Sequence, residues 1–188
     1  MHRFDVETLP AGRWRNGGGA TREIASRPAG ADDFGWRASV ADIGRGGPFS
    51  EFPGVDRTLT LLSGDGVRLR CPGVFDRLLT GVGEPFGFSG DLALDAELPS
   101  GPCRVLNLMV RRGRWTARVD RSDRTVEVLP GRAGVVYALR GSWRADPYHT
   151  VLTAGQGVWW DADEAPGGAV APLSPDAVAL WADVTPLR

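Results

Sequence analysis

The chain has 188 residues, of which 42% are hydrophobic and 24% are charged, values typical of a globular protein with one large domain or two small ones. The net charge of −1 and the pI near 6.1 argue against nucleic acid and against a membrane surface as main partners. No apolar run approaches the roughly 20 residues that span a bilayer. The two cysteines, Cys71 and Cys103, form no C-x-x-C motif, so we expect free thiols in a reducing cytoplasm.

Two features of the composition narrow the fold and the chemistry. The 26 glycines and 14 prolines favour many short strands joined by tight turns. All 22 basic residues other than histidine are arginines. Because there is no lysine, the chain can form neither a P-loop nor a Schiff base.

The first segments combine a short strand with a glycine run. Residues 4–9 alternate in polarity and predict a strand. Three glycines at 17–19 let the backbone bend freely or approach another group closely. Residues 20–25, if extended, place Thr21 and Glu23 on one face of a strand.

The clearest alternation lies in residues 36–43. It predicts a strand with Trp36, Ala38 and Val40 on one face and Arg37, Ser39 and Ala41 on the other. Residues 44–54 are rich in glycine and proline and predict a loop, in which Phe49 and Phe52 would be packing anchors.

Strand signals continue to the end of the chain. Residues 58–62 and 67–70 flank a turn at 63–66 and predict a hairpin. Shorter strands are predicted at 78–79 and 86–88, and a nearly continuous apolar strand at 104–110. Residues 120–123 read as a polar turn, and 174–179 as a short helix.

The second half repeats the first in outline. Residues 135–142 match 59–65, residues 151–157 match 86–91, and residues 177–184 match the strand around Asn107. Two copies of one unit of short strands predict a duplicated small β-barrel or jelly roll.

Several motifs occur together in one order: W14-x-N16-G-G-G-x-T21-x-E23, W36-R-x-S39, G47-P-F-S-x-F52-P-G54, D56-R57 and L106-N-L-M109. In this combination the chain resembles the HutD/Ves family. The resemblance implies an all-β bicupin, with two double-stranded β-helix (jelly-roll) barrels in one compact unit. We place the first barrel and its pocket in residues 1–112, and the second in 113–188.

The resemblance also implies a function. Family members are thought to bind a small carboxylate such as formylglutamate and to restrain histidine utilisation. Ves-type members are associated with stress responses.

Cupins commonly hold a metal with two or three histidines and a glutamate. This chain has only His2 and His149 and no His-x-His. We therefore expect no metal and no other cofactor, and we expect His149 to lie at the surface or to cap a turn.

Without a metal, binding would rest on hydrogen bonds and charge. Arg37 and Arg57 are candidate carboxylate receptors, because a guanidinium offers two parallel donors. Each could instead form an internal salt bridge, with Glu23 as the obvious partner of Arg37. Glu23 itself could be a general base if it is buried, or only an ion-pair partner.

Polar and apolar side chains complete the candidate site. Asn107 interrupts an apolar strand, so its amide needs a partner, either the backbone of a neighbouring strand or a ligand. Trp14 is expected to wall the pocket or to pack in the core. The predicted ligand-binding set is Asn16, Thr21, Glu23, Arg37, Ser39, Ser50, Phe52, Arg57, Asn107 and Met109.

Three hypotheses for function remain open. The first is a metal-free binder of a small carboxylate metabolite that acts as a regulator. The second is a metal-independent enzyme in which Glu23 moves a proton while Arg37 or Arg57 steadies an oxyanion. The third is an interaction module that works as a homodimer. No nucleophile and base pair is recognisable, since Ser50 does not lie in a Gly-x-Ser-x-Gly motif.

Overall fold

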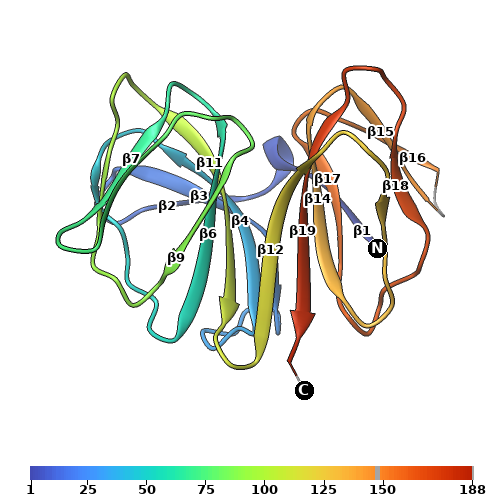
Figure 1. The fold of residues 1–188 in the computed structure, drawn as a ribbon, viewed down its shortest axis with the longest axis horizontal. Helices are drawn as coiled ribbons and strands as arrows, with labels where there is room; N and C mark the ends of the chain where they lie inside the picture. Colours follow the sequence, from blue (N-terminus) through green and yellow to red (C-terminus); the bar gives the residue numbers. More distant parts are fainter. Residues whose placement is uncertain (147–148, 188) are drawn as a thin grey trace.

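The computed structural model describes residues 1–146 and 149–187, which form two β-barrels side by side (Figure 1). Each barrel consists of one larger and one four-stranded sheet. A single turn of 3-10 helix, η1 (Val6–Thr8), follows the first strand. No helix in the described ranges is long and apolar enough to cross a membrane.

The first barrel closes around a six-stranded sheet and a four-stranded sheet. In spatial order the larger sheet contains β2 (Ala11–Arg13), β3 (Gly19–Arg27), β4 (Trp36–Ile43), β11 (Cys103–Arg111), β6 (Val55–Ser63) and β9 (Pro85–Ser89). The smaller sheet contains β5 (Gly47–Pro48), β10 (Asp95–Glu97), β7 (Val67–Cys71) and β8 (Phe75–Leu79).

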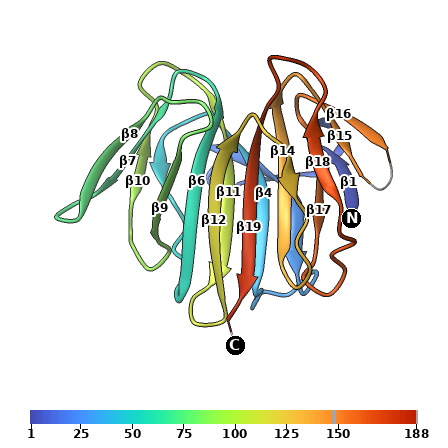
Figure 2. The ribbon, with the colours of Figure 1, turned by 45° about the vertical axis from the view of Figure 1, so that its right-hand side comes forward.

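The second barrel has the same plan, as a view turned by 45° makes visible (Figure 2). Its five-stranded sheet contains β1 (His2–Asp5), β17 (Gln156–Trp160), β14 (Ala133–Arg140), β19 (Val178–Pro186) and β12 (Trp115–Ser122). Its four-stranded sheet contains β13 (Val126–Glu127), β18 (Ala169–Pro172), β15 (Ser142–Ala145) and β16 (Thr150–Thr153).

Strand order confirms the predicted duplication. The run β9-β6-β11-β4 corresponds to β17-β14-β19-β12, and β5-β10-β7-β8 corresponds to β13-β18-β15-β16. Both large sheets also shift register at the same place, opposite Arg104 and Val105 in one and opposite Val178 and Ala179 in the other. One predicted match is wrong, because residues 151–153 form β16, the counterpart of β8, whereas β17 is the counterpart of β9.

The N-terminal strand crosses to the other half of the molecule. β1 pairs with β17 in the second barrel, so the strand nearest the N-terminus completes the C-terminal sheet (Figure 1). The division of the chain into barrels at residue 112 stays a prediction. β1 does not follow that division, because it precedes residue 112 in the chain and belongs to the sheet of the second barrel. The strand is also shorter than predicted from residues 4–9, because the Asp5 carboxylate accepts the Glu7 N–H and starts η1.

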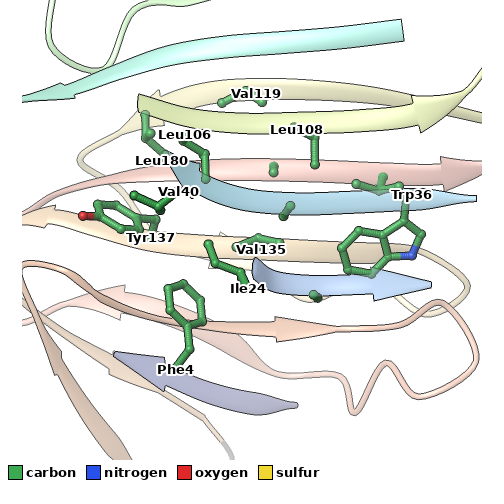
Figure 3. Close-up of a cluster of buried hydrophobic side chains, with 14 of the residues drawn as sticks. Phe4, Ile24, Trp36, Val40, Leu106, Leu108, Val119, Val135, Tyr137 and Leu180 are labelled. Carbon is green, nitrogen blue, oxygen red and sulfur yellow. The ribbon is translucent and has the colours of Figure 1, made fainter. Parts of the chain in front are cut away.

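The large sheets of the two barrels face each other across a common apolar core (Figure 3). Trp36 and Val40 of β4 and Leu108 of β11 meet Val135 and Leu180 of the second barrel there, all with side chains almost fully buried. Strand alternation sends the other face of β4 into the first barrel. The predicted faces of residues 36–43 are therefore confirmed, and Arg37, Ser39 and Ala41 line the first barrel.

The predicted hairpin of residues 58–70 is wrong. β6 pairs with β11 and β9, whereas β7 pairs with β10 and β8. The turn at 63–66 is present, but it carries the chain from one sheet to the other. At this corner a Cβ on Gly64 would lie 2.6 Å from the Pro102 carbonyl oxygen, so the corner requires glycine.

Two further expectations are wrong because strand pairing overrides local composition. Residues 120–122 belong to β12, which stays paired with β19 as far as Ser122 opposite Ala179. The predicted helix at 174–179 is a turn followed by the start of β19. The polar or helix-tolerant residues in both segments are held extended by their neighbours.

Candidate ligand-binding cavity in the first barrel

A cavity of about 680 Å³ opens in the first barrel. Its floor is the inner face of the six-stranded sheet, where paired residues form rows across the strands. One row carries Ser39 of β4, Asn107 of β11 and Leu59 of β6. The next carries Arg37, Met109 and Arg57 on the same three strands.

Nine of the ten predicted site residues line this cavity. They are Asn16, Thr21, Arg37, Ser39, Ser50, Phe52, Arg57, Asn107 and Met109. The arrangement brings together two guanidiniums, two amides, three hydroxyls and an apolar wall. Whether these residues bind a ligand stays a prediction.

Arg57 is the most unusual of these side chains. It is only 6% exposed, and no acidic side chain among the described residues forms an ion pair with it. One terminal nitrogen donates to the Ser50 carbonyl oxygen at 3.1 Å, while its buried Nε has no partner. Burial, and next the like charge of Arg37, lower the pKa of Arg57 to about 10.

Aromatic rings surround the Arg57 guanidinium. Its central carbon lies 5.0 Å from the centre of the Phe88 ring, 5.2 Å from Phe52 and 5.5 Å from Phe49. Such contacts stabilise a cation through the negative ring faces, but they do not neutralise it. The guanidinium therefore keeps its charge and much of its donor capacity for a group that enters the cavity.

Arg37 differs because it already has a partner. Its Nε donates to the Glu23 carboxylate at 2.7 Å. This is the internal salt bridge that the sequence analysis gave as the alternative to ligand binding. Glu23 itself does not line the cavity, and its side chain is 45% exposed. This exposure contradicts the condition of burial under which Glu23 could act as a general base.

The amide of Asn107 lies beside the two arginines. Asn107 is 8% exposed, and its Oδ1 has no hydrogen-bond partner in the described part of the protein. Its backbone pairs with both β4 and β6, but neither strand donates a hydrogen bond to the side-chain Oδ1. A buried amide without a partner is costly, and a ligand donor could supply that partner.

The glycine run forms one edge of the cavity. A Cβ on Gly19 would lie 2.3 Å from the Asp42 carbonyl oxygen and 3.1 Å from the Trp14 ring, so this glycine permits a close approach. Asn16 accepts the Gly18 N–H at 2.9 Å, and Trp14 donates to the Thr21 hydroxyl at 2.8 Å. The segment is therefore a fixed rim, in which the Asn16 and Thr21 side-chain oxygens each already accept a hydrogen bond and the Thr21 hydroxyl keeps its own hydrogen to donate.

Sequence reasoning missed several cavity residues. Arg13 and Arg15 flank Trp14 and line the cavity, together with the apolar Ala41, Pro48, Phe49, Leu59 and Val105. Of these, Phe49 was expected only as a packing anchor. Arg13 ends β2 and Arg15 begins the turn that follows it, so the pattern of a single strand gave no signal for the pair.

The donor set does not suit a cupin metal. The cavity lining includes no His, Cys, Asp or Glu, which are the usual ligands of transition metals. No group of three or more such residues that could hold a metal occurs elsewhere in the described ranges. His149 is exposed, near Asp146, and both cysteines are free and buried.

Comparison with known proteins places this chain in a family. The family model HutD matches residues 6–176. The chain belongs to the HutD family. It is 39% identical to Protein Ves of Citrobacter koseri, over 98% of this chain and 94% of that protein.

Solved structures agree with this assignment. HutD from Pseudomonas fluorescens SBW25 superposes with a TM-score of 0.83 at 27% identity, covering 100% of this chain and 99% of that one. A cupin 2 conserved barrel domain protein from Leptotrichia buccalis shares the fold, with a TM-score of 0.58 at 9% identity over 99% of this chain and 96% of that one. The family's bicupin architecture, expected from the motifs, is confirmed.

The second barrel of this HutD family member is filled where the first is open. Both large sheets shift register at the same point, and counting residues from this point aligns the two barrels. In this alignment Gly134 corresponds to Arg57, and Trp181 corresponds to Asn107. The Trp160 and Trp181 rings stack at 5.4 Å, and a Cβ on Gly134 would lie 2.5 Å from Trp181. Indole rings thus occupy the positions that are polar in the first barrel.

Proposed function

We propose that this protein binds a small carboxylate-bearing metabolite in its first barrel and that the carboxylate pairs with Arg57. The observation that carries the proposal is a guanidinium that is almost completely buried, lacks an acidic partner among the described residues and faces a cavity. A charge held in this way costs folding free energy unless a partner compensates it.

A carboxylate fits this position better than a neutral ligand. It accepts parallel hydrogen bonds from a guanidinium, and such charge-assisted bonds are stronger than hydrogen bonds between neutral groups. The free Oδ1 of Asn107 would accept an N–H or O–H from the same ligand. A metabolite with a carboxylate next to an amide or hydroxyl satisfies both groups.

Formylglutamate is one such acid and is the ligand that the family resemblance suggests. Our proposal extends to the role expected from that resemblance, a cytoplasmic regulator that senses this acid and restrains histidine utilisation. No described acidic side chain or histidine lines the cavity for proton transfer. For this reason a binding role is favoured over the enzymatic one.

Isothermal titration calorimetry with formylglutamate, urocanate and related acids tests the proposal. Arg57→Met should weaken binding roughly 10- to 100-fold, because a hydrogen bond to a charged group contributes about 1.5–3 kcal/mol. Arg124→Met is the matched control, since Arg124 is 92% exposed in the second barrel.

Two further measurements, the melting temperature of the variant and the chemical recovery of the acid, complete the experiment. Arg57→Met should keep or raise the melting temperature of the ligand-free protein, because it removes a buried charge that no described acidic side chain compensates. Chromatography of the mixture should recover the acid unchanged. Equal affinity in the wild type and in Arg57→Met would contradict the proposal, and turnover of the acid would favour an enzyme.

A further inference from the structure

The arginines of this protein divide into two groups by their partners. Fifteen of the described arginines lie within 4.0 Å of an acidic side chain. The six described arginines without an acidic partner are Arg3, Arg13, Arg15, Arg45, Arg57 and Arg121. Half of these, Arg13, Arg15 and Arg57, line the cavity in the first barrel.

The two arginines that sequence reasoning missed lie at the solvent-exposed end of that cavity. Arg13 and Arg15 are exposed, whereas Arg57 is buried. Trp14 between them is fixed through its N–H to Gly19, its indole hydrogen bond to Thr21 and an edge contact with the Phe49 ring. Both cations therefore project from a backbone that is held in place.

Arg57 lies far from this pair across the sheet. Arg13 ends β2 and Arg57 lies on β6, with three strands between them. Strands are spaced about 4.8 Å apart, so the two backbones are separated by roughly 19 Å along the sheet. Because Arg57 is buried inside the barrel while Arg13 and Arg15 are exposed, the two positions suit two separate acidic groups.

We infer that Arg13 and Arg15 form a second anion-binding position at the mouth of the cavity, so that the ligand carries two acidic groups. One group pairs with Arg57 inside the barrel, and the other meets the mouth arginines. This inference rests on the proposed function and deepens it. The cavity lining supports it, because in the described ranges it carries four arginines and no acidic residue.

The test compares acids of matched length. Calorimetry with glutarate and pentanoate separates the contribution of the second carboxylate from that of the chain. The wild type should bind glutarate at least about fivefold more tightly, as two exposed ion pairs would allow. Added salt should reduce this preference, because the mouth is exposed to solvent.

Two double variants test whether the preference for glutarate over pentanoate arises from Arg13 and Arg15 at the mouth of the cavity. The double variant Arg13→Gln/Arg15→Gln should lose the preference for glutarate and keep its affinity for pentanoate within about twofold. The control Arg118→Gln/Arg124→Gln changes the net charge equally, at residues of the second barrel that are 78% and 92% exposed, and should keep the preference. Loss of the preference in the control would show a general charge effect and overturn the inference.

The outcomes separate the two proposals. If the wild type binds pentanoate and glutarate equally well, or if the double variant keeps the preference, the second position is overturned and the proposed carboxylate site stands. If the wild type binds neither acid, both proposals fail.

Discussion

At the level of single residues, the proposed acid binding depends on the charge of Arg57. Its pKa is lowered, yet a value of about 10 keeps the guanidinium charged at neutral pH. The unfolded chain holds this proton more tightly than the folded protein does, so the free-energy cost of burying the charge is fully present below pH 10 and declines as the pH rises above it. A bound carboxylate would offset part of that cost.

This charge state gives a pH dependence for binding. Affinity for a carboxylate should be constant between about pH 6 and 9, because no described group that titrates in that range lines the cavity. Affinity should fall as the pH approaches the lowered pKa of Arg57. Calorimetry across buffers checks the profile, and a loss of affinity centred near pH 6 or 7 would point to a different binding group.

Most of the polar site residues could be predicted from the sequence, and Glu23 shows why the prediction had a limit. Alternation places Thr21 and Glu23 on one face, and their pairing with Ala41 and Ser39 keeps them there. Thr21 lines the cavity, while the half-exposed Glu23 carboxylate pairs with Arg37 instead. Which of two partners a charged side chain takes depends on the neighbouring strand, which the sequence of one strand does not show.

At the scale of elements, the glycine run sets the rim of the cavity. Gly19 packs against β4 and the Trp14 ring, whereas Gly17 has open space around its Cα and a φ of 68°. Gly19 is required because a side chain would clash with its neighbours, whereas Gly17 is required only by its backbone conformation.

Two substitutions separate these requirements. Gly19→Ala should destabilise the protein by about 2–3 kcal/mol, as overpacking does, and should weaken acid binding because Trp14 is displaced. Gly17→Ala should cost about 1 kcal/mol from its positive φ and should leave binding nearly unchanged. Denaturant melts and calorimetry on both variants check this, and equal effects on binding would contradict a packing role for Gly19.

The strong alternation of β4 allowed its two faces to be predicted, and the apolar run of β11 allowed it to be predicted as a strand. The strands with which each element pairs could not be predicted. The turn at 63–66 has the composition of a hairpin turn whether the next strand returns to its own sheet or crosses to another, and here β6 and β7 separate. Arg13 and Arg15 were missed for a related reason, because exposed arginines at a strand end resemble ordinary solvent-facing residues.

At the scale of the whole molecule, duplication has produced two barrels of one topology and different interiors. The large sheets bury a common core, in which Trp36 of the first barrel and Leu180 of the second are almost inaccessible. β1 adds a strand from the N-terminus to the second barrel. The second barrel therefore contributes packing to the unit, while the first holds the cavity.

The most direct test is a crystal structure of the protein grown with glutarate. We predict one bound acid in the first barrel, with a carboxylate oxygen within hydrogen-bond distance of the Arg57 guanidinium, and none in the second barrel, where Trp160 and Trp181 stack. A first barrel closed by its own side chains, with the acid absent or bound only at the outer surface, would contradict the account.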